Sequence, residues 1–282
     1  GSIKKGAEKE KKSFTIEQVA LNGKRSVIYQ YKKEKADEEV YTELNAIVDY
    51  VQAYCANHKI LKVPDICLPA LPNRVNYSER CSVWQEQNII QDGFTMQVPI
   101  GIYDDPDNQY QGEAAIDIAQ NNTIMIGSAQ YGKTNLLQLM IRSLTEQYSP
   151  DEFTFYVLDF GTRVLSVFDE MKHCGGVVCS GEDEKFTNLF KYLHIEMEVR
   201  KEKLLQFGVT SYSAYRDAGQ NDIPLIMLLI DNFTAVKELY LSNQDVLLDI
   251  CRDGSSLGIT VVMTNTMTSG IGFRYMSNFS NK

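Results

Sequence analysis

The strongest constraint on this chain is a single short segment, Gly127-Ser128-Ala129-Gln130-Tyr131-Gly132-Lys133-Thr134. It matches the phosphate-binding pattern G-x-x-x-x-G-K-[ST] at every fixed position. A strand-like run at 122–126 precedes the segment and a helix-like run at 135–141 follows it. This is the strand–loop–helix context that the pattern requires. The alternative is a glycine-bounded turn before a buried helix. It is disfavoured because a chain of this length matches by chance only about once in a hundred.

The segment predicts a binding site for ATP and Mg²⁺ at the end of a strand. Backbone N–H groups of such a loop form a nest for phosphate oxygens, and the dipole of the following helix attracts the same anion. Lys133 would reach the β- and γ-phosphates, and the Thr134 hydroxyl would ligate the metal. The predicted nucleotide-binding residues are Gly127, Ser128, Ala129, Gln130, Tyr131, Gly132, Lys133, Thr134 and Asn135.

A second strand supplies the acid that this kind of site needs. Residues 225–230 form an uninterrupted apolar run, and Asp231 follows it directly. A strand of this composition is buried on both faces, so Asp231 would emerge at its carboxyl end and bind Mg²⁺. We therefore predict Thr134 and Asp231 as the metal ligands. The open alternative is that Asp231 only caps the helix that follows it.

Asn232 occupies the next position, where many hydrolysing motors carry a glutamate that orients the attacking water. An amide can hydrogen-bond a water but cannot act as a base. The predicted catalytic set of Lys133, Asp231 and Asn232 therefore favours ATP binding with weak or no hydrolysis. At the tip of a later strand, Thr264-Asn265-Thr266 either senses the γ-phosphate or is an ordinary exit from the strand.

The spacing of apolar residues predicts an α/β fold from about Val98 onward. Strand-like and helical patterns alternate, which indicates a mainly parallel sheet flanked by helices. In such sheets the ligand lies at the carboxyl ends of the strands. The longest predicted helix spans 183–207, and Gly208 stands where a C-terminal cap belongs. Strands are expected at 123–126, 153–159, 177–179, 225–230 and 260–263.

The N-terminal part has a different composition. Residues 1–13 read as a charged linker, and Gly1-Ser2 is typical of tag cleavage, so we expect a fragment excised from a longer protein. We assign 14–88 to an attachment between modules and 89–282 to the ATPase domain. The attachment is predicted to contain an edge strand at 26–31, an amphipathic helix at about 37–55 and an extended proline-rich strap at 63–72. We expect the helix and the strap to pack on the ATPase domain; the open alternative is that their apolar residues contact a neighbouring module.

Composition argues against several classes of protein. The net charge of -9 and the isoelectric point near 5.0 argue against a nucleic-acid groove, and hence against DNA as a partner. The sequence contains no apolar run long enough for a membrane span and no apolar core of a signal peptide. The six cysteines form no CxxC pair and the three histidines show no ligand spacing, which disfavours a zinc site and indicates reduced thiols.

Together these motifs resemble the FtsK/SpoIIIE group of motor ATPases and, more narrowly, the EssC/EccC ATPases of type VII secretion systems. The resemblance covers nearly all of the chain from about Tyr41. Leu158-Asp159-Phe160-Gly161 and the pair Asp231-Asn232 are similar to the second of three tandem ATPase modules in that group. The resembling segments are 98–106, 127–134, 156–161, 229–233 and 252–259.

The resemblance implies a RecA-like P-loop NTPase that is the cytoplasmic portion of a bacterial membrane-anchored motor. It also implies a hexamer of the full-length motor, contacts with neighbouring ATPase modules, and secreted substrates that are small helical WXG100-type proteins. The resemblance also implies at least one more strand beyond the position of Lys282. We therefore expect the sheet to lack its closing edge.

Three other functions stay open at this point. The chain could be an active ATPase whose base comes from elsewhere in the sequence or from a neighbouring subunit. It could also be an FtsK-like DNA translocase, or a structural docking module with a vestigial nucleotide site. Arg252 is the candidate for the cation that a motor presents to the γ-phosphate of its neighbour. The alternative for Arg252 is a surface ion pair with Asp249 or Asp253.

Overall fold

The computed structural model describes residues 14–21, 23–31, 43–60, 67–77, 93–240 and 244–281. The chain divides into two units, Gly1–Ile66 and Cys67–Lys282, called unit 1 and unit 2 below. The predicted linker at 1–13 and the first part of the predicted strap lie outside the described residues.

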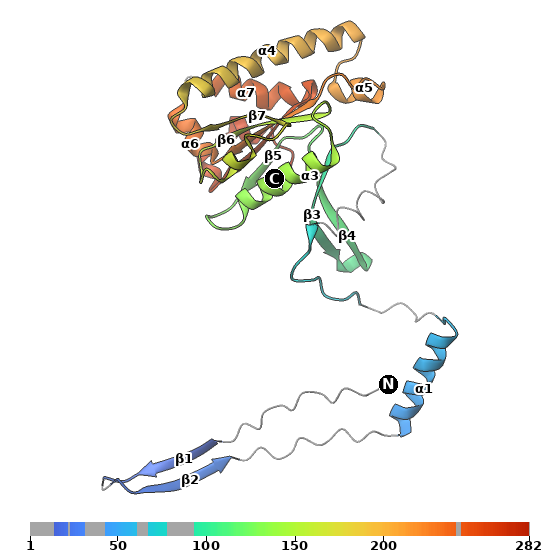
Figure 1. The fold of residues 1–282 in the computed structure, drawn as a ribbon, viewed down its shortest axis with the longest axis vertical. Helices are drawn as coiled ribbons and strands as arrows, with labels where there is room; N and C mark the ends of the chain where they lie inside the picture. Colours follow the sequence, from blue (N-terminus) through green and yellow to red (C-terminus); the bar gives the residue numbers. More distant parts are fainter. Residues whose placement is uncertain are drawn as a thin grey trace. The chain divides into compact units, whose positions relative to one another are not determined.

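Unit 1 contains a β-hairpin (Figure 1). Its strand β1 (Phe14–Val19) pairs antiparallel with β2 (Arg25–Tyr31), and the register shifts between Ile16 and Glu17. The edge strand predicted at 26–31 is therefore one arm of a hairpin.

The helix α1 (Glu43–Asn57) of unit 1 confirms that the apolar spacing in this region is helical. Its apolar side chains are exposed, with Val48 45% and Val51 50% accessible. The structure does not bury them, so the packing of this helix on the ATPase domain stays a prediction.

The centre of unit 2 is a five-stranded parallel sheet with the strand order β5-β9-β8-β6-β7 (Figure 1). Strands β8 and β9 are buried at every position. Helices cover both faces of the sheet, so its inner strands must be apolar throughout, which explains the unbroken run before Asp231. All five predicted strands are confirmed. Their bounds are β5 (Thr123–Ile126), β6 (Phe153–Asp159), β7 (Cys174–Cys179), β8 (Leu225–Asp231) and β9 (Ile259–Asn265).

Helices cover the two faces of this sheet as right-handed crossovers require. Figure 1 shows α3, which joins β5 to β6, on one face and α4 with α7 on the other. This is the α/β architecture predicted from the alternating patterns. The α-helices are α3 (Lys133–Gln147), α4 (Asp183–Phe207), α5 (Tyr212–Asp217), α6 (Phe233–Leu239), α7 (Gln244–Asp253) and α8 (Phe273–Met276). Short 3-10 helices are η1 (Pro106–Asn108), η2 (Val164–Phe168), η4 (Gly254–Leu257) and η5 (Thr268–Gly270).

The end of the long helix α4 confirms its predicted cap. Gly208 has a φ of 87°, in the left-handed region that glycine adopts without a steric penalty. Its N–H donates to the carbonyl oxygens of Leu204 and Leu205. The helix therefore ends at Phe207 because the next residue can close it.

A second, two-stranded antiparallel sheet pairs β3 (Gln97–Asp105) with β4 (Tyr110–Asp117). Part of the proline-rich strap lies against it, since Gln111 Nε2 donates to the carbonyl oxygen of Pro69 at 2.7 Å. Further along, the Arg142 guanidinium lies 5.0 Å from the centre of the Tyr77 ring. The described part of the strap thus contacts the sheet formed by β3 and β4 at Pro69, whereas the Leu68 side chain is 40% exposed, so the predicted packing of its apolar side chains on the core stays a prediction.

The side chain of Asn122 joins three elements at the amino end of the sheet. Its Nδ2 donates to the carbonyl oxygens of Cys251 at 2.7 Å and Asn278 at 3.1 Å. Its Oδ1 accepts from Val261 N at 2.8 Å. The side chain is 3% exposed, so a single buried amide holds α7, β9 and the segment after α8 to the start of β5.

Strand β5 lies at one edge of the sheet. Asn281 forms an isolated parallel bridge with Thr123, and the Ile124 N–H donates to the carbonyl oxygen of Asn281 at 2.9 Å. The chain therefore returns to the edge of β5 at its last described residue.

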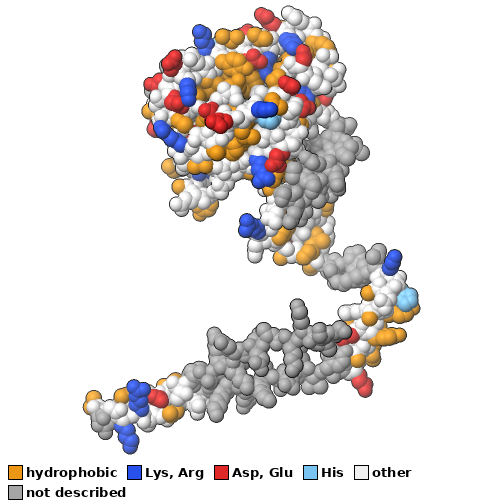
Figure 2. All heavy atoms as spheres, in the orientation of Figure 1, with side chains coloured by type: hydrophobic (Ala, Val, Ile, Leu, Met, Phe, Trp, Pro, Cys, Tyr) orange, Lys and Arg blue, Asp and Glu red, His pale blue; other side chains and the backbone are white. Residues whose placement is uncertain are grey.

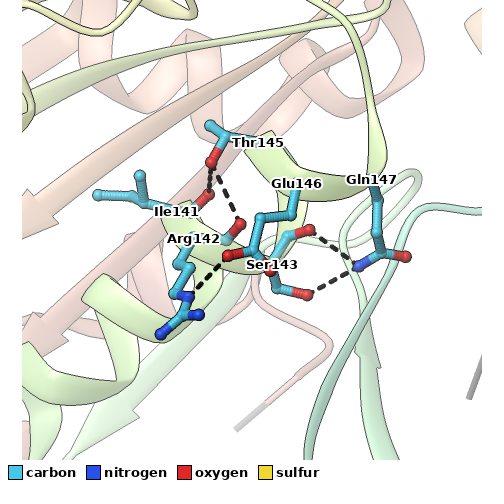
Figure 3. A network of polar contacts seen from close by, with 6 residues as sticks. All are labelled: Ile141, Arg142, Ser143, Thr145, Glu146 and Gln147. Carbon is cyan, nitrogen blue, oxygen red and sulfur yellow. Dashed lines mark hydrogen bonds and ion pairs between the residues drawn. The ribbon is translucent and has the colours of Figure 1, made fainter. Parts of the chain in front are cut away.

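A polar network stabilises the second half of α3, the helix whose first turn carries the phosphate loop (Figure 3). Arg142 Nε donates to Glu146 Oε1 at 2.7 Å. Gln147 Nε2 donates to both the carbonyl oxygen and the hydroxyl of Ser143, at 2.9 and 2.8 Å. Ser143 is fully buried, so these bonds satisfy a polar group on the face of α3 that packs on the sheet.

Candidate phosphate and metal site

The predicted phosphate loop lies between the end of β5 and the start of α3. Gln130 and Gly132 have φ values of 67° and 81°. Left-handed residues within a turn are typical of the backbone nests that bind anions. Most of the loop is exposed, and the Tyr131 side chain is 82% accessible. The predicted binding residues 127–135 are therefore together in one exposed turn at the carboxyl end of a strand.

The ammonium group of Lys133 lies within this loop. Its Nζ donates to the carbonyl oxygens of Gly127 at 2.6 Å and Ser128 at 2.8 Å. These are neutral acceptors, and phosphate oxygens would replace them with stronger charge-assisted bonds. The side chain is therefore already inside the loop that would hold the phosphates.

The predicted metal ligands Thr134 and Asp231 meet between the first turn of α3 and the end of β8. The Thr134 hydroxyl donates to Asp231 Oδ2 at 3.3 Å, and the Thr264 hydroxyl donates to Asp231 Oδ1 at 2.6 Å. Asp231 is 4% exposed. Both carboxylate oxygens of Asp231 thus accept hydrogen bonds from hydroxyls. Asp231 does not cap the helix that follows, because the residue directly before α6 is Asn232. The helix-capping alternative for Asp231 is wrong for this reason.

The oxygen pair of Thr134 and Asp231 suits Mg²⁺. This ion prefers hard oxygen ligands, is usually held by one or two protein groups plus substrate phosphates, and keeps several waters. Among the residues that the structure describes, no cluster of three or more His, Cys, Asp or Glu side chains could hold a metal on its own. A metal here would therefore depend on nucleotide phosphates for its remaining ligands.

Asn232 is held in a distinctive conformation. Its φ and ψ are 67° and 70°, in the left-handed region that asparagine tolerates better than most residues. Its N–H donates to Thr264 Oγ1 at 3.0 Å, and its Nδ2 donates to the carbonyl oxygen of Phe160 at 3.4 Å. The amide that replaces the usual glutamate is therefore bonded to the neighbouring strand.

The two polar residues Thr264 and Asn265 at the end of β9 contact different parts of the molecule. Thr264 bonds to Asp231 and so belongs to the metal site. Asn265 instead ties β9 to α6: its Oδ1 accepts from Thr234 Oγ1 at 2.8 Å, and its Nδ2 donates to the Met267 carbonyl oxygen at 2.7 Å. Thr264 is therefore the member of this group that the fold brings to the site.

Two residues of the site were missed by the sequence reasoning. Asp159 is the register partner of Asp231 on the adjacent strand, and it is 1% exposed. Gly161 lies in the turn that follows β6, where a β carbon would contact the Asp231 carboxylate. The available signal was the pair of aspartates at the ends of two apolar strands.

A groove of about 640 Å³ opens beside the phosphate loop. Lys133 and Gly132 line one end, and Ile126, Leu136 and Ile100 form apolar walls. Apolar walls with a few polar groups at one end are typical of sites that hold a small organic ligand. The groove is therefore continuous with the place where phosphates would bind.

Arg252 does not lie near this site. It occupies the last turn of α7, which runs back from the carboxyl end of β8 toward the amino end of β9. Its guanidinium pairs with Asp249 at 2.9 Å and Asp253 at 2.7 Å, and the hydrogen bonds that it donates to the Asp253 carboxylate raise the pKa of Arg252. The ion pairs of the surface alternative are therefore present, and a role of Arg252 toward the γ-phosphate of a neighbouring subunit stays a prediction.

A phosphate loop and a strand-end aspartate on a parallel α/β sheet define a RecA-like P-loop NTPase. The chain belongs to the FtsK/SpoIIIE family, whose model matches residues 91–276. Nucleotide binding is the property that this family implies.

Relatives narrow the comparison to secretion ATPases. The chain is 28% identical over 281 residues to the ESX secretion system protein EccC of Geobacillus thermodenitrificans (strain NG80-2), a match that covers 99% of this chain and 18% of that protein. It is 28% identical over 235 residues to the Type VII secretion system protein EssC of Staphylococcus aureus (strain Mu50 / ATCC 700699), covering 82% of this chain and 16% of that protein. The chain therefore spans less than a fifth of the length of these relatives.

Solved structures of secretion ATPases are also similar to this chain. A structure of EssC (ATPases 2 and 3) from Geobacillus thermodenitrificans matches with a TM-score of 0.63 and 29% identity over 75% of this chain and 39% of that one. The cytoplasmic domain of EssC matches with a TM-score of 0.61 and 29% identity over 66% of this chain and 36% of that one. Within the described part of this chain, no helix has the length and hydrophobicity to cross a membrane.

Proposed function

We propose that this chain is an ATP-binding module of a type VII secretion motor, with weak or no hydrolysis by itself. The observation that carries the proposal is the meeting of Thr134 and Asp231 at 3.3 Å beside the phosphate loop. Two oxygen donors from separate motifs approach each other only if the loop and the strand end form one site.

The place of the module within a longer motor rests on its relatives. One solved relative carries two ATPase modules in one chain, which supports neighbouring ATPase modules as partners. We assign residues 14–88 to the attachment between modules and 89–282 to the ATPase domain. The hexamer, the WXG100-type substrates, the membrane anchor and the cytoplasmic location belong to the same proposal about the whole motor.

Weak hydrolysis is supported by the position after Asp231. Asn232 offers an amide that already donates to Phe160, and an amide cannot take a proton from water. General-base help contributes about 10²–10⁴-fold to a rate. We therefore expect turnover well below ~1 s⁻¹, the low end for competent enzymes.

Nucleotide-induced thermal stabilisation tests the binding proposal. A ligand present at about 100 times its Kd adds about 2.7 kcal/mol of stability, so ATP with Mg²⁺ should raise the melting temperature of the wild-type chain. Lys133→Ala should abolish the increase, and Lys172→Ala, a substitution remote from the loop in sequence, should keep it. An unchanged increase in the Lys133 variant would place the site elsewhere.

The DNA-translocase alternative predicts salt-dependent binding to duplex DNA. On the face shown in Figure 2, Lys and Arg side chains are interspersed with Asp and Glu and do not form a basic stripe. This mixture, together with the net charge of -9, favours a protein substrate. A titration with DNA at two salt concentrations would support the alternative if affinity fell steeply with salt.

A further inference from the structure

Gly161 lies against the carboxylate that would bind the metal. A β carbon at this position would lie 2.5 Å from Oδ2 of Asp231 and 3.2 Å from its Cγ. Both distances are shorter than the separation at which non-bonded atoms attract, about 3.5–4.0 Å for carbon. Any side chain at residue 161 would therefore displace the carboxylate or the turn.

The backbone conformation does not explain the glycine. The φ of Gly161 lies outside the left-handed region, so an alanine could adopt the same backbone without strain. What the position requires is the absence of a side chain. The requirement comes from Asp231, because the other atom near a β carbon, Asp159 Oδ1, would lie at an ordinary 3.9 Å.

The turn that contains Gly161 cannot easily retreat from Asp231. Gly161 N and Arg163 N donate to Asp159 Oδ1 at 3.3 and 3.0 Å, and Leu165 N donates to its Oδ2 at 2.9 Å. In addition, Phe160 N donates to the carbonyl oxygen of Asp231 at 3.2 Å. A methyl group at residue 161 would therefore move the carboxylate rather than the turn.

The atom that a side chain at residue 161 would displace is the Asp231 oxygen that faces Thr134 and the proposed Mg²⁺ position. Thr264 holds Oδ1 of Asp231 at 2.6 Å, whereas Oδ2 lies 3.3 Å from the Thr134 hydroxyl. Oδ2 is also the atom that a side chain at Gly161 would strike. One carboxylate oxygen is thus fixed by a hydroxyl, and the position of the other depends on the empty space at Gly161.

We propose that Gly161 is a positioning residue that keeps Oδ2 of Asp231 where it can share Mg²⁺ with Thr134. The inference rests on the proposed binding of nucleotide and Mg²⁺ at this site. It assigns a purpose to the turn after β6, which lies against Asp231. Gly161 acts through Asp231 and is therefore not itself a ligand.

Titration of ATP, once with Mg²⁺ and once with EDTA, tests the inference. The ratio of the two ATP affinities measures how much Mg²⁺ tightens binding. Changes outside the direct ligands of a metal commonly cost about 10–100-fold in affinity, so Gly161→Ala should reduce the Mg²⁺-dependent tightening of ATP binding about tenfold. Binding in EDTA should stay within about twofold of wild type, because the phosphate loop is unchanged. Gly101→Ala is the matched control, since no described atom lies within 4 Å of a β carbon there, and it should behave as wild type.

The outcomes separate the two proposals. If wild type and Gly161→Ala gain the same tightening from Mg²⁺, the positioning role is overturned while nucleotide binding stands. If wild type binds no ATP in either condition, the proposed function fails and the positioning role fails with it.

Thermal unfolding in the absence of ligand provides a second test, which also covers a poorly folding Gly161→Ala variant. Asp231→Ala removes the atoms that the new methyl group would strike. Gly161→Ala should therefore lower the melting temperature in the wild-type background and have little effect in the Asp231→Ala background, a non-additivity expected of residues in contact. An equal loss in both backgrounds would mean that the methyl group collides elsewhere, which would overturn the inference.

Discussion

Asp159 and Asp231 are register partners at the ends of adjacent parallel strands, yet they face different groups. Asp159 accepts three backbone N–H groups from the turn that follows its own strand. Asp231 accepts two hydroxyls from other elements, Thr134 of α3 and Thr264 of β9. One carboxylate therefore builds the turn that lies against the other, and only Asp231 faces the phosphate loop.

Replacement of Asp159 by alanine should destabilise the protein without removing a metal ligand. The change leaves Gly161, Arg163 and Leu165 without their side-chain acceptor, and an unsatisfied buried donor costs about 1–3 kcal/mol. We expect urea unfolding to show a loss of about 2–3 kcal/mol. Asp159→Asn keeps one acceptor oxygen and should lose less. Equal losses in the two variants would contradict the acceptor role.

Asn122→Ala should be among the more damaging single changes at the amino end of the sheet. It removes three hydrogen bonds from a buried amide and leaves the Val261 N–H and the Cys251 carbonyl oxygen without these partners. A loss of about 2–4 kcal/mol in the free energy of unfolding is expected, at about 1 kcal/mol per bond plus the desolvation cost. The neighbouring Asn121→Ala is the control and should lose under about 0.5 kcal/mol. A small loss at Asn122 would show that waters replace the amide.

The parts of the fold that repeat a pattern were predictable from the sequence. The strand before Asp231 is apolar at six successive positions because it is covered on both faces. The phosphate loop was predictable because its glycines and Lys133 have fixed spacing and a strand and a helix on either side. Gly208 ended α4 as expected because a left-handed cap strongly favours glycine.

Features that depend on contacts between distant segments were not predictable. Nothing in the local sequence shows that Gly161 lies against Asp231, because the two residues meet only through the pairing of β6 with β8. The same holds for Asn265, whose side-chain oxygen accepts from the Thr234 hydroxyl of α6. The hairpin formed by β1 and β2 was predicted only as one edge strand, because its first arm carries a weak apolar pattern.

The turn between α3 and β6 should make stability depend on acidic pH. Ser149 donates its N–H and its hydroxyl to Glu152 Oε2 at 3.0 and 2.9 Å, which lowers the pKa of Glu152. A lowered pKa in the folded state contributes stability above the unfolded value of 4.5, and this contribution is lost as the pH falls. We expect Glu152→Gln to cost under about 1 kcal/mol near neutral pH, and this cost should shrink as the pH falls below 4.5. A difference from wild type that is constant from pH 6 to pH 3 would rule out this role.

Restoring a glutamate after Asp231 should not by itself create an efficient ATPase. Asn232 has φ 67° and ψ 70°, and residues other than glycine, asparagine and aspartate lose about 1–2 kcal/mol in this region. Asn232→Glu should therefore lower stability by about 1 kcal/mol and break the bond to Phe160. Its carboxylate would then leave the position from which a base must contact water.

The hydrolysis rate of Asn232→Glu should accordingly stay within about tenfold of wild type, far below the 10²–10⁴-fold that a well-placed base contributes. Asn232→Gln is the matched control, because it bears the same backbone cost and has nearly the same length without the charge. Rates measured under saturating ATP and Mg²⁺ for the two variants isolate the contribution of the carboxylate. A hundredfold advantage of the glutamate variant over the glutamine variant would show that the backbone at residue 232 already has the geometry for hydrolysis. Weak turnover would then be due to the missing base alone.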